Sequence, residues 1–113
     1  GDVFWMHVGG KGSEPQGRRP VVVVQHDRFN HTKLQTIVVA AITSNLRLAA
    51  LPGNVRLPKG EAHLTVPCVV NVTQLVTIDR SRLMDRAGRL SLAKREEIAQ
   101  GLQLLLGGDE LSQ

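Results

Sequence analysis

Two adjacent arginines, Arg18 and Arg19, end a glycine-rich segment and stand directly before a proline and a run of four valines. A guanidinium group is planar and can donate two parallel, charge-assisted hydrogen bonds to a phosphate. The glycines predict a loop over residues 9–19, and the valines predict a buried strand over residues 21–25. A loop anchored on a rigid strand can expose a side chain and still hold it in position. The segment is therefore predicted to bind an anion.

The composition indicates which kind of anion. The formal net charge of +4 favours a polyanionic partner, either nucleic acid or an acidic protein segment. Three aromatic residues make up the whole aromatic set, so a wide platform for stacking bases is not expected. The four histidines, His7, His26, His31 and His63, have no clustered ligand spacing. We therefore expect neither a metal site nor a cofactor.

Length and cysteine content indicate the broad class of protein. The chain has 113 residues, which suits a single domain over residues 1–113 with one modest core. Cys68 is the one cysteine, so an intrachain disulfide is excluded, and a reducing cytoplasm is the expected location. Valines surround Cys68 and predict that its side chain is buried. No apolar run of 18 residues is present, so no membrane span is expected.

Strands dominate the predicted elements. Short β-branched or alternating runs predict strands over residues 2–8, 21–25, 36–42, 55–57 and 65–72. A helical turn is expected at 79–83, and residues 88–90 return to extended structure. One long helix is predicted over residues 92–106, with Ser91 as its N-cap and a stop at Gly107. The pattern predicts a mainly β fold, a strongly curved antiparallel sheet with one C-terminal helix.

Two side-chain patterns concern packing. The helix carries an apolar stripe that is predicted to belong to the core: Ile98, Ala99, Leu102, Leu105 and Leu106. Gly101 interrupts this helix at a cost of about 1 kcal/mol relative to alanine, which indicates a close backbone approach. Trp5, on the first predicted strand, is expected in the core or in a dimer interface rather than on a base-stacking surface.

Several segments in a fixed order resemble one protein family. The quoted segments are residues 1–5, 12–24, 39–44 and 74–79, followed by Arg82-Leu83, Gly88 and the terminal amphipathic helix. In this order and spacing the chain resembles, over essentially its full length, the MazF/PemK/Kid family of bacterial toxin endoribonucleases from type II toxin–antitoxin systems. The resemblance implies a small SH3-like antiparallel β-barrel of the CcdB/Kid/MazF type with a C-terminal α-helix, assembled as a homodimer.

The same resemblance implies an activity and its partners. Such toxins cleave single-stranded RNA, mRNA included, at short sequence motifs without a metal ion, and leave 2′,3′-cyclic phosphate and 5′-hydroxyl ends. The implied partners are single-stranded RNA and a cognate antitoxin, whose acidic, disordered tail lies in the same groove. Two alternatives remain open, a non-enzymatic CcdB-like toxin that binds DNA gyrase and a degenerate member that binds RNA or antitoxin without cleavage. The terminal Leu111-Ser112-Gln113 argues against the first alternative, because gyrase poisons of that type use a terminal tryptophan.

The resemblance also assigns roles to residues. The family's catalytic arginine corresponds to Arg19, and its catalytic threonine corresponds to Thr43. The RNA-binding candidates are Ser13, Glu14, Gln16, Arg18, Gln74 and Thr77. Arginine stays protonated at neutral pH and is a poor proton acceptor, so another residue is expected to act as the general base unless the site of Arg19 is unusual. Glu14 and His26 are the two candidates for that base.

Overall fold

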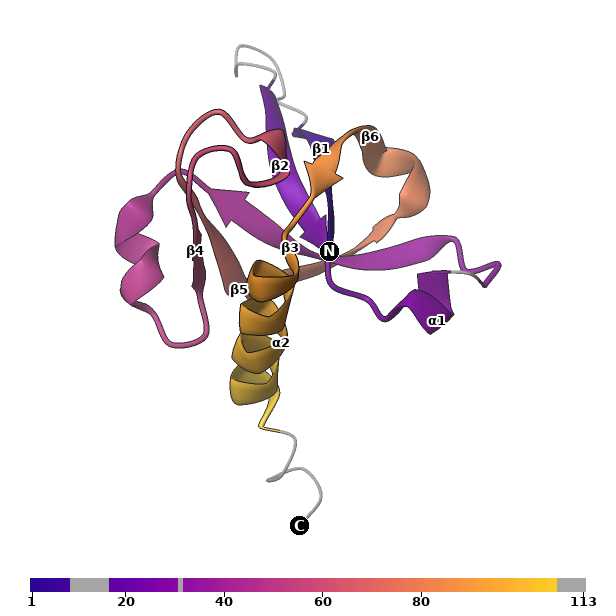
Figure 1. The fold of residues 1–113 in the computed structure, drawn as a ribbon. Helices are drawn as coiled ribbons and strands as arrows, with labels where there is room; N and C mark the ends of the chain where they lie inside the picture. Colours follow the sequence, from indigo (N-terminus) through magenta and orange to yellow (C-terminus); the bar gives the residue numbers. More distant parts are fainter. Residues whose placement is uncertain (9–16, 31, 108–113) are drawn as a thin grey trace.

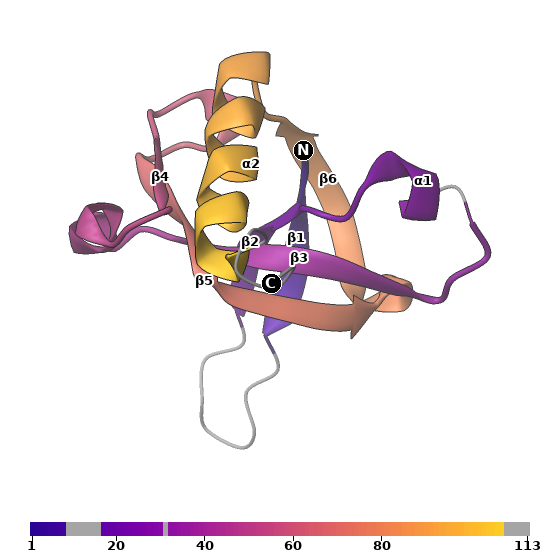
Figure 2. The same ribbon diagram turned by 90° about the horizontal axis from the view of Figure 1, so that it is seen from below.

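The structure, a computed structural model, describes residues 1–8, 17–30 and 32–107. These residues form one antiparallel sheet in the order β4-β5-β3-β2-β1-β6 (Figure 1). Its strands are β1 (Asp2–Val8), β2 (Gly17–Val23), β3 (Thr36–Thr43), β4 (Val55–Leu57), β5 (Cys68–Asp79) and β6 (Leu83–Arg89). The long helix α2 (Leu92–Leu106) lies against β4 and β5, while the sheet curls away from it toward β6 (Figure 2). This is the curled β fold with a C-terminal helix that the sequence predicts.

Four short helical segments connect the strands: α1 (Asp27–Asn30), η1 (Leu46–Ala50), η2 (Glu61–His63) and η3 (Arg80–Arg82). The predicted bounds of β1, β4 and α2 are confirmed, and β3 is one residue longer than predicted. The helical turn expected at 79–83 is η3, whose N-cap is Asp79. Within the described residues, no helix has the length and apolar character needed to cross a membrane.

The prediction that Arg18 and Arg19 lie in a loop is wrong, because β2 begins at Gly17. Arg18 pairs with His7 and Arg19 pairs with Met6 in the β1–β2 ladder. Both arginines are exposed, so no burial pattern in the sequence marks them as strand residues. The strand also ends at Val23, two residues earlier than predicted.

The predicted bounds of the last two strands are also corrected. β5 begins at Cys68, after Pro67 rather than through it, because proline cannot donate to a ladder. It then continues to Asp79, seven residues beyond the predicted end at 72, because β3 offers pairing partners to the residues from Leu75 to Asp79. β6 begins at Leu83 rather than at residue 88 and pairs with β1.

Side chains alternate between two apolar clusters on the two faces of the sheet. One face carries the larger cluster, which includes Val3, Val22, Ala40 and Ile42 and extends to Ile98 of α2. The other face carries a smaller cluster of Val21, Val23, Ile37, Val39 and Ile78. Neighbouring residues of β2 and β3 therefore point into different clusters, as a strand period of two requires.

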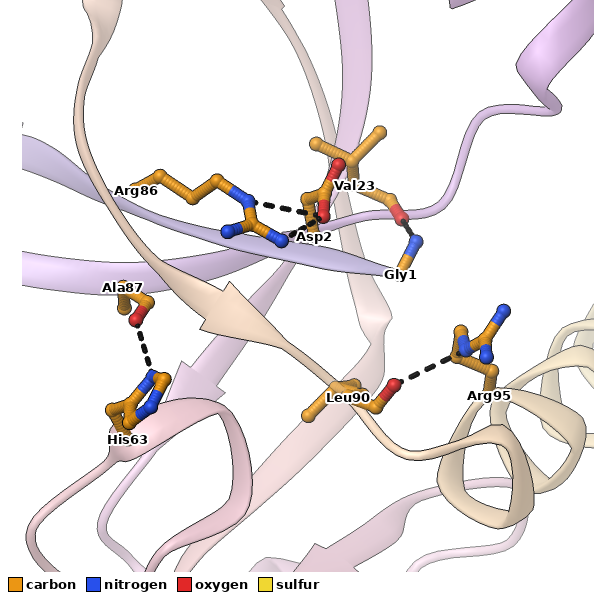
Figure 3. Close-up of polar contacts among 8 residues, drawn as sticks. All are labelled: Gly1, Asp2, Val23, His63, Arg86, Ala87, Leu90 and Arg95. Carbon is orange, nitrogen blue, oxygen red and sulfur yellow. Dashed lines mark hydrogen bonds and ion pairs between the residues drawn. The ribbon is translucent and has the colours of Figure 1, made fainter.

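The two edge strands, β4 and β6, are bridged by η2. The ring Nδ1 of His63 lies 2.9 Å from the carbonyl oxygen of Ala87 in β6 (Figure 3). A Cβ at Gly88 would lie 2.7 Å from that same nitrogen, so glycine is needed for η2 to approach. On the opposite side of β6, Arg86 donates to Asp2 at 3.0 Å and ties the strand to β1. The His63 contact thus links the edge strand β6 to the segment that follows the other edge strand, β4.

The helix termini follow the predicted capping. The hydroxyl of Ser91 accepts a hydrogen bond from the backbone N–H of Lys94 at 3.4 Å, and Gly107 adopts a left-handed conformation with φ 57°. Gly101 is buried against the turn at Gly53, where a Cβ would collide with the Gly53 carbonyl oxygen. The predicted reason for a glycine inside this helix is confirmed.

The prediction that the apolar stripe of α2 belongs to the core is only partly confirmed, because Ala99 is exposed. Ile98 is buried and Leu102 packs against the larger cluster. The prediction that the stripe is core to its end is wrong, since Leu105 is 42% exposed and Leu106 is 56% exposed. No described segment covers this last turn. The prediction for Cys68 is confirmed, because its side chain is buried in the larger cluster.

Candidate nucleic-acid interface

Arg19 and Thr43 belong to neighbouring strands and lie at the same end of the β2–β3 pair. The β2–β3 ladder places Val21 opposite Ala41, and both strands continue for two more residues, to Arg19 and Thr43. Arg19 is two residues from Val21, and Thr43 is two residues from Ala41, so by strand alternation both lie on the face of the sheet that this pair occupies. The sheet therefore brings the two predicted catalytic residues together.

The hydroxyl of Thr43 has a defined orientation. Its Oγ1 accepts a hydrogen bond from the backbone N–H of Asn45 at 3.1 Å. Because this bond uses an oxygen lone pair, the hydroxyl hydrogen is left to donate to another group. Asn45 in turn caps η1 by accepting from the backbone N–H of Arg47 at 3.2 Å. The end of β3 thus holds a hydroxyl donor on the same face of the sheet as Arg19.

Arg18 points to the opposite face from Arg19. Its guanidinium carbon lies 5.1 Å from the centre of the Trp5 ring, a cation–π contact. Its Nη1 is 3.5 Å from a carboxylate oxygen of Asp85 in β6. Among the described residues, no hydrogen bond or ion pair engages the side chain of Arg19. Among the described residues, Arg19 therefore keeps its guanidinium donors available to an anion, whereas Arg18 already shares one with Asp85.

A hollow of about 390 Å³ opens beside the arginine pair. Its lining comes from β1, β2, the end of β3 and the segment before β5: Trp5, Gly17, Arg18, Arg19, Pro20, Ile42, Ser44, Leu64, Thr65, Val66 and Cys68. Burial raises the pKa of the Cys68 thiol, so the thiol is neutral at physiological pH. The hollow combines apolar walls, two hydroxyl-bearing residues and the two arginines, whose side chains point to opposite faces of β2.

Gln74 lies where the β3–β5 pairing is interrupted. The register shifts between Ala40, which pairs with Leu75, and Ala41, which pairs with Asn71. A side-chain hydrogen bond stabilises the bulge between them, in which the Asn71 side chain accepts from the backbone N–H of Thr73 at 3.2 Å. Gln74 is exposed there, next to the half of β3 that ends at Thr43. The bulge is a backbone feature that strand propensity did not predict.

A second asparagine completes the bulge. Asn54, in the turn before β4, accepts from the backbone N–H of Val72 at 2.9 Å and donates to the carbonyl oxygen of Leu48 at 2.8 Å. Sequence reasoning assigned no role to Asn54 or Asn71. Their only sequence signal is an amide side chain within or beside a run of valines, where burial requires hydrogen-bond partners.

Thr77 and His26 lie at the other end of the strand pair. Thr77 is exposed and pairs with Val38, five residues along β3 from Thr43, or roughly 16 Å. His26 follows the end of β2, and Arg19 to Val23 alone spans roughly 13 Å. The His26 Nδ1 accepts from the backbone N–H of Arg28 at 3.0 Å. The structure thus separates His26 from the Arg19–Thr43 pair.

Three predicted site residues, Ser13, Glu14 and Gln16, lie outside the described residues. Within the described residues, no three histidine, cysteine, aspartate or glutamate side chains cluster as metal ligands would. Asp79, at the end of β5, accepts from the backbone N–H of Ser81 at 2.8 Å, and this bond lowers the pKa of its carboxyl group. Asp79 is thus occupied in capping η3.

Comparison with known proteins identifies the family. A family model described as a PemK-like, MazF-like toxin of type II toxin–antitoxin systems matches residues 1–106. The chain belongs to the PemK/MazF toxin family. The endoribonuclease MazF2 of Mycobacterium bovis is 42% identical over 106 residues, which make up 93% of each chain. Membership places the chain in the MazF class of endoribonuclease toxins, as the sequence resemblance predicted.

Solved MazF structures share the fold. One of them, described as an endoribonuclease in complex with its cognate antitoxin from a mycobacterial species, matches with a TM-score of 0.74 and 25% identity. That match covers 95% of this chain and 92% of the other. The Mycobacterium tuberculosis toxin MazF-mt6 matches with a TM-score of 0.76 and 20% identity, over 94% of this chain and 96% of that one. The MazF fold therefore accounts for the whole curled sheet and its helix.

Proposed function

We propose that this MazF-family chain cleaves single-stranded RNA at short sequence motifs, with Arg19 and Thr43 acting on the scissile phosphate. The observation that carries the proposal is their placement on one face, at the same end of two paired strands. A guanidinium fork and an oriented hydroxyl there form a set of donors suited to a phosphate group. The match of the whole described chain to a family of endoribonuclease toxins supports the same role.

The chemistry is a transesterification within the RNA. The 2′-oxygen attacks the adjacent phosphorus, the bond from phosphorus to the 5′-oxygen breaks, and the ends are a 2′,3′-cyclic phosphate and a 5′-hydroxyl. The proton of the 2′-hydroxyl passes to a general base, and the departing 5′-oxygen gains a proton. An extra negative charge develops on the phosphate oxygens in between. Donors from Arg19 and Thr43 stabilise that charge, so the reaction proceeds without a metal ion or cofactor.

Glu14 is the proposed general base. His26 is the weaker candidate, because it follows the far end of β2 and its Nδ1 already accepts a backbone hydrogen bond. Glu14 belongs to the segment that leads directly into β2, where Arg18 and Arg19 are found. A carboxylate is ionised at neutral pH and can accept the proton that a guanidinium cannot.

The RNA is proposed to follow β3 and β5. From the scissile phosphate at Arg19 and Thr43, the strand would pass the exposed Gln74 and reach Thr77 about five residues further along β3. Ser13, Gln16 and Arg18 would contact it on the other side. The net charge of +4 favours this polyanion and also the acidic, disordered tail of a cognate antitoxin in the same groove.

The working form is proposed to be a cytoplasmic homodimer. The exposed leucines at the end of α2 support an additional protein surface there, because Leu104, Leu105 and Leu106 form a contiguous apolar group. The structure of a relative bound to its antitoxin supports a protein partner for this chain as well.

The test is digestion of a long mixed-sequence RNA in EDTA by the wild-type chain and by Arg19→Ala. Arg56→Ala is the matched control, because Arg56 is an exposed arginine on the edge strand β4. We expect discrete cuts with cyclic-phosphate ends from the wild type and the control, and loss of these cuts with Arg19→Ala. Cuts that survive in Arg19→Ala would overturn its catalytic role. No cleavage by a folded wild-type chain would favour a gyrase-binding or degenerate toxin.

A further inference from the structure

We propose that the hollow beside Arg19 is a nucleobase pocket, in which the base stacks on the guanidinium of Arg18. The proposal rests on the proposed RNA cleavage and adds to it a place where one base is recognised. The hollow of about 390 Å³ falls in the ~300–1,000 Å³ range of small-molecule sites, so it suits a nucleoside rather than a folded segment.

The walls of the hollow suit a flat, mostly apolar ring. Ile42, Leu64 and Val66 contribute aliphatic surface, and the Cys68 thiol is neutral. Ser44 and Thr65 add polar groups to the lining, and their hydroxyls both donate and accept. A base has an apolar face and a polar edge, and this division of the lining matches it.

Arg18 is prepared for stacking rather than for clamping a phosphate. One edge of its guanidinium is used by Asp85 at 3.5 Å, and one face lies over Trp5 at 5.1 Å. The side chain remains 50% exposed, so the group retains accessible surface on which a base can stack. Trp5 and Asp85 are proposed as positioning residues, because both contact the guanidinium of Arg18.

The adjacent arginine, Arg19, is proposed to have a different role from Arg18. Arg18 and Arg19 are consecutive in β2, so they point to opposite faces of the same strand. Among the described residues, an anionic partner is found for Arg18 and none is found for Arg19. Arg19 is thus left for the phosphate and Arg18 for the base of a neighbouring nucleotide. This pairing links cleavage to the identity of one base.

The fluorescence of a tryptophan in the chain can report whether the hollow is occupied. Trp5 is the single tryptophan, and it lines the hollow, so its emission reports on this site alone. The probes are 2′-O-methyl RNA oligomers of U, C or A, which cannot be cleaved at the methylated 2′-oxygen, and an abasic oligomer of the same length and charge. Binding is followed in parallel by fluorescence polarisation of an end label, which is independent of the hollow.

We expect at least one base-containing oligomer to change the Trp5 emission saturably. Its affinity should exceed that of the abasic oligomer by roughly 5- to 150-fold, the effect of about 1–3 kcal/mol of stacking for one base. Arg18→Lys keeps the positive charge and removes the planar group. It should therefore bring the ratio of base-containing to abasic affinity close to one, while Arg56→Lys should leave that ratio at the wild-type value. In mixed-sequence RNA, Arg18→Lys should relax the motif at one position.

The failures of the two proposals are distinguishable. Cleavage and tight RNA binding with the same Trp5 emission for abasic and base-containing oligomers would overturn the pocket and leave the ribonuclease standing. An unchanged motif in Arg18→Lys would do the same. No cleavage and no binding of any oligomer would overturn both. A response of Trp5 to an acidic, leucine-containing peptide but to no RNA would assign the hollow to a protein segment.

Discussion

Gly101 of α2 packs directly on the backbone of Gly53, in the turn that precedes β4. A Cβ at Gly101 would collide with the Gly53 carbonyl oxygen, and a Cβ at Gly53 would lie 2.9 Å from the Gly101 carbonyl oxygen. Gly53 also has a φ of 85°, which disfavours any other residue. This contact between backbones fixes α2 against the edge of the sheet.

Gly101→Ala should lower the free energy of unfolding, although alanine is the better helix former. The propensity gain is about 1 kcal/mol, whereas forcing a methyl group into a packed contact costs typically 1–3 kcal/mol and here meets backbone atoms that cannot rotate away. We expect a net loss of about 1 kcal/mol or more in chemical denaturation. Gln103→Ala, on the exposed side of the same helix, is the control and should change stability little. A Gly101→Ala chain as stable as the wild type would contradict the tight contact.

Glu61 should contribute to stability through the start of α2. Its carboxylate accepts from the backbone N–H of Ser91 at 2.7 Å and from the Ser91 hydroxyl at 3.3 Å. A carboxylate is stabilising at a helix N-terminus, where backbone donors lack partners. Glu61→Ala should therefore lower the free energy of unfolding by about 1–2 kcal/mol. Glu96→Ala, an exposed acid within α2, is the control, and equal effects of the two changes would refute the cap.

The fold was predictable wherever burial follows a period. β4 has the predicted bounds because apolar and polar residues alternate along it, β1 because it is rich in aromatic and β-branched residues, and α2 because a cap and a glycine mark its ends. The start of β2 was missed because Arg18 and Arg19 are exposed and are paired by the opposite strand, which is a tertiary effect. The end of β5 was missed for the same reason.

The candidate site was only partly predictable. The family resemblance identified Arg19 and Thr43, and the sheet register brings them together. The hollow was not predictable, because residues 64–66 reach it from the connection between β4 and β5, whereas most of its other lining residues belong to β1, β2 and the end of β3. Nor did the sequence show that Trp5, a plausible core residue, lies beneath an arginine. Long-range packing of this kind leaves no local periodic signal.

Asp79 should make stability depend on acid pH. Its carboxyl pKa is lowered by hydrogen bonds from Ser81, so the charged form is favoured in the folded chain. The stabilisation is complete above the unfolded pKa of about 3.9 and is lost as the pH falls through the lower folded value. Asp79→Ala should thus unfold more easily than the wild type at pH 7, and the difference should shrink below about pH 4. A difference that stays constant from pH 7 to pH 2 would exclude the titrating cap.

Substitutions of Thr43 can separate an effect on the cleavage rate from an effect on folding. Thr43→Val keeps the shape and removes the hydroxyl, which is the proposed donor to the scissile phosphate. Loss of one preorganised donor typically lowers the rate by about 10²–10³, whereas Thr43→Ser retains the hydroxyl and should remain within about tenfold of the wild type. Single-turnover cleavage of a defined RNA measures both. Because Oγ1 also accepts from Asn45, thermal unfolding has to be measured on the same samples. A folded Thr43→Val chain with the wild-type rate would exclude the hydroxyl from catalysis.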